Sequence, residues 1–229
     1  MRALLVLPTL DEEAGVQDVL RDALKQHERF DVLVVDGRSE DATVAMVEAA
    51  GVHVVQQHGR GKGAAIRTAI DIFLAGPWHA LAMIDADGTY PVEALIGMIP
   101  MLEQHDVLVG DRLGGPLDSG SMSRLNFLGN RFLSAVASAV HRTDAADVCS
   151  GCWVIERSVV EGLRLNSLGF ELEAELFASL AGMGHSPTWV RIPYRSRKGE
   201  AKLTSILDGV RILRKLLVRR VMRARKTHL

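Results

Sequence analysis

The chain has 229 residues, of which 48% are hydrophobic and 24% are charged. This composition can fill a sizeable core and excludes an intrinsically disordered protein. Because the net charge is −1, the chain as a whole is not a general polyanion binder, and we expect no nucleic acid partner.

The first half of the sequence alternates short apolar runs with segments of helical character. The apolar runs predict buried strands at residues 3–7, 32–35, 52–56 and 80–84. Helices are expected from residue 11 to about 26, and over residues 41–50 and 64–74. Apolar strands that alternate with helices are typical of a mostly parallel sheet covered on both faces. We therefore predict an α/β fold with a Rossmann-like sheet.

The second half is less regular. Strands are expected at residues 107–110, 152–155 and 189–192, and helices at residues 123–141 and 171–183. No apolar run reaches the ~20 residues of a membrane span, and the sequence enters its first strand without a signal peptide pattern. We therefore expect a cytoplasmic protein.

Residues 203–225 predict a basic amphipathic helix. Residues 204–229 hold eight Lys or Arg and one acid, Asp208, with apolar residues at helical spacing between the bases. Such a helix can lie in an anionic membrane interface, which would make the protein peripheral on the cytoplasmic face. The alternative is a helix that packs on the protein body with a charged outer face.

Acidic residues follow several of the predicted strands. They are Asp11, Glu12, Asp36, Asp85 and Asp87. Because ligands bind beyond the carboxyl ends of strands in such sheets, we expect these side chains to converge on one edge. Asp85 and Asp87, two residues apart on a turn, can share a hard divalent cation, which would neutralise a diphosphate leaving group. An ordinary acidic turn is the alternative.

Three further patterns leave alternatives open. The glycines at 59, 61 and 63 predict either a phosphate-binding loop or a flexible turn. Residues 191–202 hold five bases and one acid, which fits either a phosphate clamp or a solvated loop. Cys149 and Cys152 could form a redox pair or half a zinc site, but without a second ligand pair we favour two reduced thiols.

An ordered series of motifs carries a family resemblance. The motifs are PTLDE (8–12), VDGRSEDAT (35–43), GKGAA (61–65), DADGTYP (85–91), GDR (110–112), DVCSG (147–151) and RKGEAKL (197–203). Together they resemble the family 2 glycosyltransferases of GT-A fold, and most closely the dolichol-phosphate mannose synthase group. The resemblance covers about residues 3–205.

This resemblance implies a role for each matching residue. Pro8, Glu12 and Asp36 would hold the nucleoside, with Lys62 and Asp85 near the base and ribose. Asp87, together with Asp85, would bind Mg²⁺ or Mn²⁺ on the diphosphate, and Arg112 would contact the sugar–phosphate region. Ser150, Arg197 and Lys202 would surround the acceptor phosphate. The implied catalytic set is Asp87, Arg112, Arg197 and Lys202.

The resulting hypothesis is a metal-dependent inverting transferase that moves a hexose or N-acetylhexosamine. It would take the sugar from a UDP- or GDP-sugar and pass it to a polyprenyl (dolichyl-type) phosphate. We expect one GT-A domain over residues 1–202, with a donor half (1–112) and an acceptor half (113–202), followed by the helix at 203–229.

Two rival functions remain open. One is a GT-A transferase with a soluble hydroxyl acceptor, for which Glu171, Glu173 and Asp147 are candidate bases. The other is a non-catalytic nucleotide-binding protein on a membrane surface.

Overall fold

The computed structural model describes residues 2–199 and 205–226, with side chains of the last helix described over 207–222. Lys202, one of the predicted acceptor residues, lies outside the described residues. The strands are β1 (Ala3–Thr9), β2 (Phe30–Asp36), β3 (His53–Gln56), β4 (Ala80–Met83), β5 (Val107–Asp111), β6 (Trp153–Glu156) and β7 (Thr188–Arg191). The helices are α1 (Glu13–Leu24), α2 (Thr43–Ala49), α3 (Lys62–Ala75), α4 (Val92–Met98), the 3₁₀-helix η1 (Ile99–Glu103), α5 (Arg124–His141), α6 (Arg157–Gly162), α7 (Leu172–Met183) and α8 (Ser205–Lys226).

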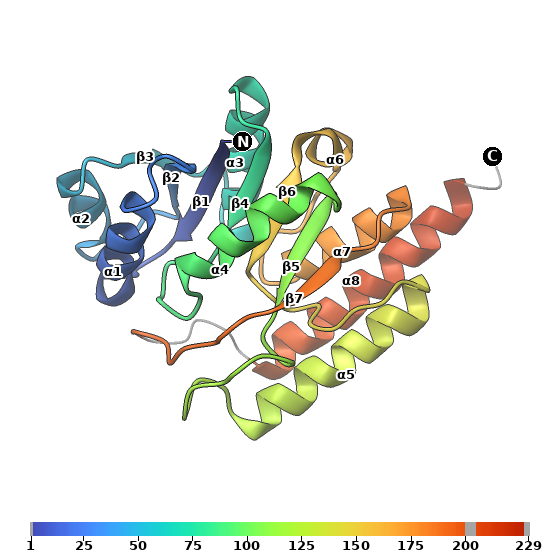
Figure 1. Ribbon diagram of the computed structural model, residues 1–229. Helices are drawn as coiled ribbons and strands as arrows, with labels where there is room; N and C mark the ends of the chain where they lie inside the picture. Colours follow the sequence, from blue (N-terminus) through green and yellow to red (C-terminus); the bar gives the residue numbers. More distant parts are fainter. Residues whose placement is uncertain (1, 200–204, 227–229) are drawn as a thin grey trace.

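Within these residues, seven strands form one sheet in the order β3-β2-β1-β4-β6-β5-β7 (Figure 1). Strands β1 to β4 are parallel to one another, and β6 is antiparallel to both of its neighbours, β4 and β5. Strand β7 runs parallel to β5. The predicted mostly parallel α/β sheet is therefore confirmed. Strands β1, β2 and β4 end at the same edge, which is the lower edge in Figure 1.

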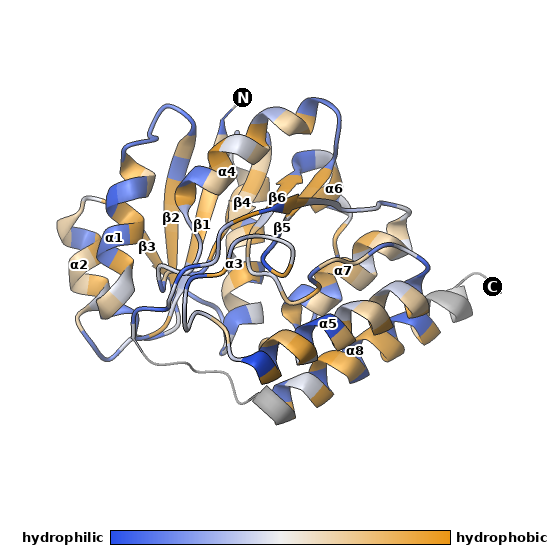
Figure 2. Ribbon diagram, turned by 60° about the horizontal axis from the view of Figure 1, so that its bottom comes forward, coloured by the Kyte–Doolittle hydropathy of each residue, from blue (hydrophilic) through white to orange (hydrophobic). Residues whose placement is uncertain are grey.

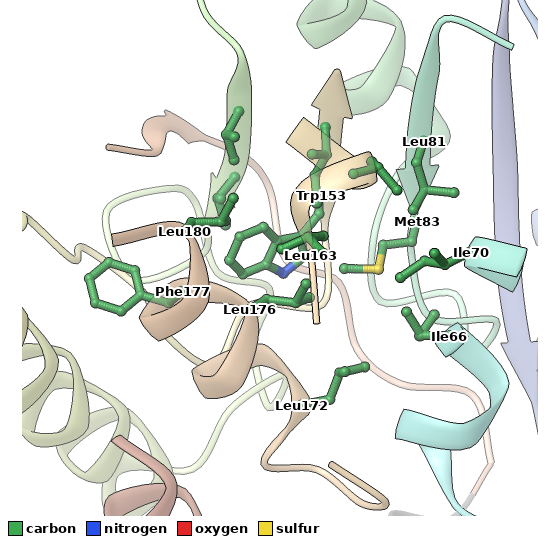
Figure 3. Packing of buried hydrophobic residues seen from close by; sticks show 14 of the residues in the cluster. Ile66, Ile70, Leu81, Met83, Trp153, Leu163, Leu172, Leu176, Phe177 and Leu180 are labelled. Atoms are coloured by element: carbon green, nitrogen blue, oxygen red, sulfur yellow. The ribbon is translucent and has the colours of Figure 1, made fainter. Parts of the chain in front are cut away.

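Two apolar clusters cover the two faces of the sheet. One packs the sheet against α3, α7 and the inner side of α8, with Trp153 fully buried at its centre (Figure 3). The other packs it against α1 and α4. Burying one Val, Leu, Ile, Phe or Met side chain contributes about 1.5–3 kcal/mol. Apolar contact is therefore the main force that holds both helical layers on the sheet.

Some elements were not predicted. Helices α4 and α6 have seven and six residues, and so short a span carries too few turns to show a helical period. Helix α5 was predicted, and its start is fixed by the Ser123 side chain, which accepts a hydrogen bond of 3.1 Å from the amide of Asn126. This is an ordinary N-cap.

The predicted C-terminal helix exists, and it packs on the body beside α5 and α7. Its inner side buries Ile212 and Leu216. Its outer side leaves large apolar residues exposed, among them Val210 at 60% and Val221 at 54%. Figure 2 shows apolar residues on the visible sides of both α5 and α8. The helix therefore packs on the body, but its outer face carries apolar as well as charged residues. The alternative prediction expected a charged outer face.

Among the described residues, no helix is long and apolar enough to cross a membrane.

Candidate active site

A cavity of about 280 Å³ opens at the edge where β1, β2 and β4 end. Its wall comes from the ends of β1, β2, β3 and β4 with the turns that follow them, the start of α3, the segment before α7 and the segment after β7. The lining residues are Pro8, Thr9, Leu10, Glu12, Gly37, Gln57, Gly61, Lys62, Ala65, Asp85, Ala86, Asp87, Gly169, Phe170 and Arg197. The structure thus brings together Pro8, Glu12, Lys62, Asp85, Asp87 and Arg197 from the predicted site.

Asp87 lies on the turn after β4 and is 1% exposed. Its Oδ1 accepts hydrogen bonds from the amide and the hydroxyl of Thr89, at 2.9 and 2.6 Å. Oδ2 accepts no hydrogen bond from the described residues, although Nη2 of Arg197 lies 2.6 Å away without hydrogen-bond alignment. Burial, and then the neighbouring Asp85, raises the pKa of Asp87 above its ordinary value. Thr89 therefore fixes the carboxylate through Oδ1, while Oδ2 is buried against the Arg197 guanidinium.

Arg197 is held over this turn by its own backbone segment. The amide of Arg195 donates to Thr89 O at 2.9 Å, and the amide of Lys198 donates to Asp87 O at 3.0 Å. The segment after β7 consequently runs across the sheet edge (Figure 1). Nη1 of Arg197 lies 3.8 Å from the Glu12 carboxylate, so one guanidinium faces both Glu12 and Asp87.

Lys62 lies between two carboxylates on the other side of the cavity. Its Nζ is 2.5 Å from Asp85 Oδ1 and 2.7 Å from Glu173 Oε1. Burial would lower the pKa of Lys62, but Asp85 and Glu173 outweigh burial and raise the pKa. Burial would likewise raise the pKa of Asp85, but Lys62 holds the pKa below its ordinary value. Lys62 and Asp85 therefore form a charged pair.

The charges around the cavity fit a divalent cation. The cations Lys62 and Arg197 face four carboxylates, which belong to Glu12, Asp85, Asp87 and Glu173. Ionised, the six groups leave an excess of two negative charges. Magnesium and manganese prefer oxygen ligands, and Asp87 Oδ2 would be one if the Arg197 guanidinium moved from it to the diphosphate. The described residues contain no cluster of three or more metal-ligating side chains, so diphosphate and water oxygens would have to complete the coordination, as is usual for Mg²⁺.

Asp36 reaches the same edge but does not line the cavity. Its carboxylate accepts hydrogen bonds from the amides of Arg38 and Ser39, at 2.8 and 3.0 Å, and from the Ser39 hydroxyl at 2.6 Å. It therefore shapes the loop after β2, in which Arg38 has a positive φ of 73°. The neighbouring Gly37 lines the cavity instead.

Arg112 and Ser150 lie behind the cavity rather than on its wall. Arg112 forms a bidentate ion pair with Asp147, in which Nε donates to Oδ2 at 2.6 Å and Nη2 donates to Oδ1 at 2.8 Å. Its guanidinium also lies over the Tyr194 ring. Ser150 is fully buried, and its hydroxyl accepts from the Cys152 amide at 3.3 Å. Neither residue lines the cavity that Arg197 faces.

The glycines at the start of α3, Gly61 before its first residue and Gly63 within it, are required by packing. A Cβ on Gly61 would lie 2.1 Å from Leu168 O, and one on Gly63 would lie 2.1 Å from Ser167 O. The Gly63 amide donates to Leu168 O at 3.0 Å. The loop therefore needs glycine to approach the backbone of residues 167 and 168, whichever ligand the cavity takes.

The sequence profile of glycosyl transferase family 2 matches residues 4–164. The chain belongs to this family.

Two relatives of this family 2 glycosyltransferase come from Haloferax volcanii. Glycosyltransferase AglJ is 35% identical over 90% of the chain and 67% of the relative. A dolichyl-phosphate hexose transferase is 31% identical over 91% of the chain and 89% of the relative. Among solved structures, glucosyl-3-phosphoglycerate synthase from Mycobacterium tuberculosis with Mg²⁺ and uridine diphosphate superposes with a TM-score of 0.75. The superposition covers 95% of the chain and 79% of the synthase at 21% identity, and it shows a shared fold.

In this glycosyltransferase, sequence reasoning found Arg197 in the second half but missed the other cavity residues there. Glu173 was considered as a general base, yet its carboxylate binds Lys62. Gly169 and Phe170 complete the wall from a segment without regular secondary structure, so no periodic pattern marked them. Cys149 and Cys152 are free thiols, as favoured from the sequence.

Proposed function

We propose that this family 2 glycosyltransferase moves one hexose or N-acetylhexosamine from a UDP- or GDP-sugar to a polyprenyl phosphate, with inversion. The observation that carries the proposal is the contact between Asp87 and Arg197 at 2.6 Å in the cavity. Asp87 and Arg197, a carboxylate and a guanidinium, meet where a diphosphate leaving group would need a metal ligand and a cation. Bound Mg²⁺ or Mn²⁺, held by Asp87 with Asp85 nearby, would neutralise the charge of that leaving group.

The other cavity residues would bind and orient the donor. Pro8, Glu12, Lys62 and Asp85 line the same cavity, where they would contact the nucleoside. Asp36 would act indirectly, by shaping the loop that contains Gly37. Arg197 would pair with phosphate oxygens, for which a guanidinium fork is well suited. The family resemblance implies the donor roles of Pro8, Glu12, Lys62 and Asp85. It implies direct nucleoside binding for Asp36 and a place at the acceptor phosphate for Arg197, so these two roles are altered here to fit the geometry.

The state of the candidate bases favours a phosphate acceptor over a hydroxyl acceptor. A hydroxyl acceptor needs a carboxylate to take its proton. Glu173 is bound to Lys62, and Asp147 is bound to Arg112 by two hydrogen bonds. The Glu171 carboxylate accepts from the amides of Leu168 and Gly169. A phosphate acceptor is already ionised near neutral pH and needs positive charge instead, which Arg197 offers. The family resemblance implies a second cation, Lys202, and the neutral Ser150 around that phosphate.

The relatives support the same acceptor class. The Haloferax relative that the chain covers over 89% of its length is a dolichyl-phosphate hexose transferase. The mycobacterial synthase holds uridine diphosphate and Mg²⁺ on the same fold. We therefore propose residues 1–202 as one catalytic domain, with donor binding mainly in 1–112 and acceptor binding mainly in 113–202.

The exposed apolar residues of α5 and α8 suit a lipid substrate. Leu125, Leu128 and Phe132 on α5 are at least 60% exposed, and Leu207, Val210, Leu217 and Val221 on α8 are exposed beside them. Arg211 and Arg214 lie among these residues on α8. Apolar side chains framed by bases are what an anionic bilayer surface binds. We propose that α8, together with α5, rests on the cytoplasmic face of the membrane.

The decisive experiment gives the protein labelled UDP- and GDP-sugars, a polyprenyl phosphate in detergent and Mn²⁺. The proposed activity places label in the organic extract, and Asp87→Asn removes it. Label in a water-soluble product that forms only with a hydroxyl acceptor would support the soluble-acceptor alternative. Binding of nucleotide without any turnover would support the non-catalytic one.

Membrane binding is tested by vesicle flotation. The double variant Leu217→Gln and Val221→Gln should lower the fraction that floats with vesicles of anionic phospholipid. Leu24→Gln, which removes a partly exposed leucine of α1, is the control and should float like the unmodified protein. Equal flotation of all three proteins would exclude the outer face of α8 as the contact.

A further inference from the structure

Two buried glutamates on the first turn of α7 point to opposite sides of the helix. Glu173 and Glu175 are 5% and 0% exposed, and residues two apart on a helix lie about 200° apart. Glu173 reaches Lys62 in the cavity. Glu175 reaches the C-terminal helix α8. The start of α7 thus lies between the cavity and the helix that we propose to rest on the membrane.

Glu175 uses both of its oxygens. Oε2 accepts from the amides of Asn166 and Ser167, at 2.9 and 2.6 Å. Oε1 accepts from Arg219 Nε at 2.9 Å and lies 3.6 Å from Lys215 Nζ. Burial would raise the pKa of Glu175, but the hydrogen bonds from Arg219, Ser167 and Asn166 outweigh burial and lower the pKa. The carboxylate is therefore ionised near neutral pH and joins α8 to residues 166 and 167.

Helix α8 also binds the same segment directly. Lys215 Nζ donates to Asn166 Oδ1 at 2.9 Å, and Arg219 Nη2 donates to Arg164 O at 2.8 Å. Residues 163–171 lack regular secondary structure, so few hydrogen bonds of their own hold them. Charged hydrogen bonds are among the stronger ones in proteins. Residues 164–167 receive theirs from α8, Glu175 and Arg67, and Glu171 binds the amides of residues 168 and 169.

The far side of this segment is the cavity wall. Gly169 and Phe170 line the cavity. Leu168 O accepts from the Gly63 amide at 3.0 Å, and Arg67 donates to Ser167 O. Gly63 follows Lys62 in the sequence, so the segment contacts the start of α3 where the charged pair of the cavity is anchored.

We infer that Glu175 is a positioning residue, which with Arg219 and Lys215 fixes residues 163–171 so that the docking of α8 sets the affinity of the cavity for its nucleotide-sugar. The nature of that ligand rests on the proposed function. The anchoring of residues 163–171 does not depend on the proposed function, because it consists of contacts within the chain.

The experiment compares Glu175→Gln and Arg219→Gln with Arg220→Gln in the full chain. Arg220 is the next residue of α8 and lines a separate cavity with Arg142 and His185, so its variant lowers the charge of α8 by the same amount and leaves the contacts of Glu175 in place. Hydrogen exchange of the Asn166 and Ser167 amides is measured without ligand, and donor KM and kcat are measured with the UDP- or GDP-sugar that gives turnover. Thermal melting shows that each variant folds.

Both test variants should exchange these amides at least about tenfold faster, and donor KM should rise about tenfold, as for the loss of a charge-assisted hydrogen bond. The kcat should stay within about twofold, because the reacting groups are untouched. Arg220→Gln should match the unmodified protein, and Arg219→Lys should restore part of the lost donor affinity.

Unchanged exchange in both test variants would overturn the anchoring. Faster exchange with an unchanged KM would show an anchored segment that does not set donor affinity, and would overturn the inference as well. If the unmodified protein binds no nucleotide-sugar, the proposed function fails, and the exchange rates still decide whether Glu175 anchors the segment.

Discussion

Nη2 of Arg197 lies 2.6 Å from Oδ2 of Asp87, and the backbone on either side of Arg197 is hydrogen-bonded to the turn that carries Asp87. The two residues are 110 positions apart in the sequence, yet one short pairing of backbone segments fixes both. Arg197 can therefore stabilise a negative charge that develops near Asp87 without a large rearrangement.

The first prediction concerns this cation. Arg197→Gln should lower kcat/KM about 10²- to 10³-fold, as expected when one preorganised donor to developing charge is lost. Arg195→Gln is the matched control, because Arg195 lies on the same segment but its guanidinium is 3.9 Å from Glu93 and does not line the cavity. Steady-state kinetics with labelled donor gives both values. Equal losses in the two variants would mean that the segment matters only as a charged loop.

The second prediction concerns the buried pair of Arg112 and Asp147. Asp147 is fully buried, and the Arg112 side chain is 8% exposed. Asp147→Asn would leave the buried guanidinium without its counter-charge, so the free energy of unfolding should fall by about 3–5 kcal/mol. Urea unfolding measures this fall.

Two controls accompany that measurement. Lys25→Gln breaks an exposed pair with Asp22 and should cost less than about 1 kcal/mol. The double variant Asp147→Asn with Arg112→Met should regain much of the loss, because no unpaired charge remains. A double variant as unstable as the single one would argue that Arg112 stabilises the fold by packing on Tyr194 rather than by its charge.

The sequence predicted the first four strands because each is a short apolar run between helical segments, and both faces of this parallel sheet are covered. The antiparallel direction of β6 could not be predicted, because an apolar run such as residues 152–155 has the same pattern in a parallel and in an antiparallel strand. Its place between β4 and β5 depends on contacts between segments about 70 and 45 residues apart. No local pattern carries that information.

The site was predictable where a motif sits at a strand end. Asp85, Asp87 and Lys62 line the cavity as the sheet topology requires. The motif does not determine which way a carboxylate points. The Asp36 carboxylate accepts a hydrogen bond from the amide of Ser39 in its own loop instead of facing the cavity. Glu173 was seen only as a possible base, because its partner Lys62 lies 111 positions away and no spacing rule links them.

A third prediction tests the close approach of the α3 loop to residues 167 and 168. Gly63→Ala would place a Cβ 2.1 Å from Ser167 O, so the backbone must shift, which should destabilise the protein by about 1–3 kcal/mol and raise the donor KM. Gly129→Ala on α5 meets no atom within 4 Å and should stabilise the helix by about 0.5–1 kcal/mol. Thermal unfolding and donor kinetics check both. A fully stable Gly63→Ala protein with normal KM would show that the contact is loose.

The last prediction concerns the two thiols. Burial raises the pKa of Cys149 and of Cys152 to about 12, so at pH 8 only about one thiol in ten thousand is ionised. Because the thiolate is the reacting form, iodoacetamide should leave both cysteines unmodified in the native protein and modify both after denaturation. The slow native rate should rise about tenfold per pH unit.

Ser119→Cys supplies the internal control, because it adds a thiol on an exposed loop that should react within minutes under the same conditions. Mass spectrometry of the peptides distinguishes the three sites. Fast native labelling of Cys149, which is only partly buried, would mean that its thiolate is stabilised by a contact the chain makes in solution. The C-x-x-C pair would then regain its redox interpretation, whereas equal protection of both thiols assigns them to packing beside β6.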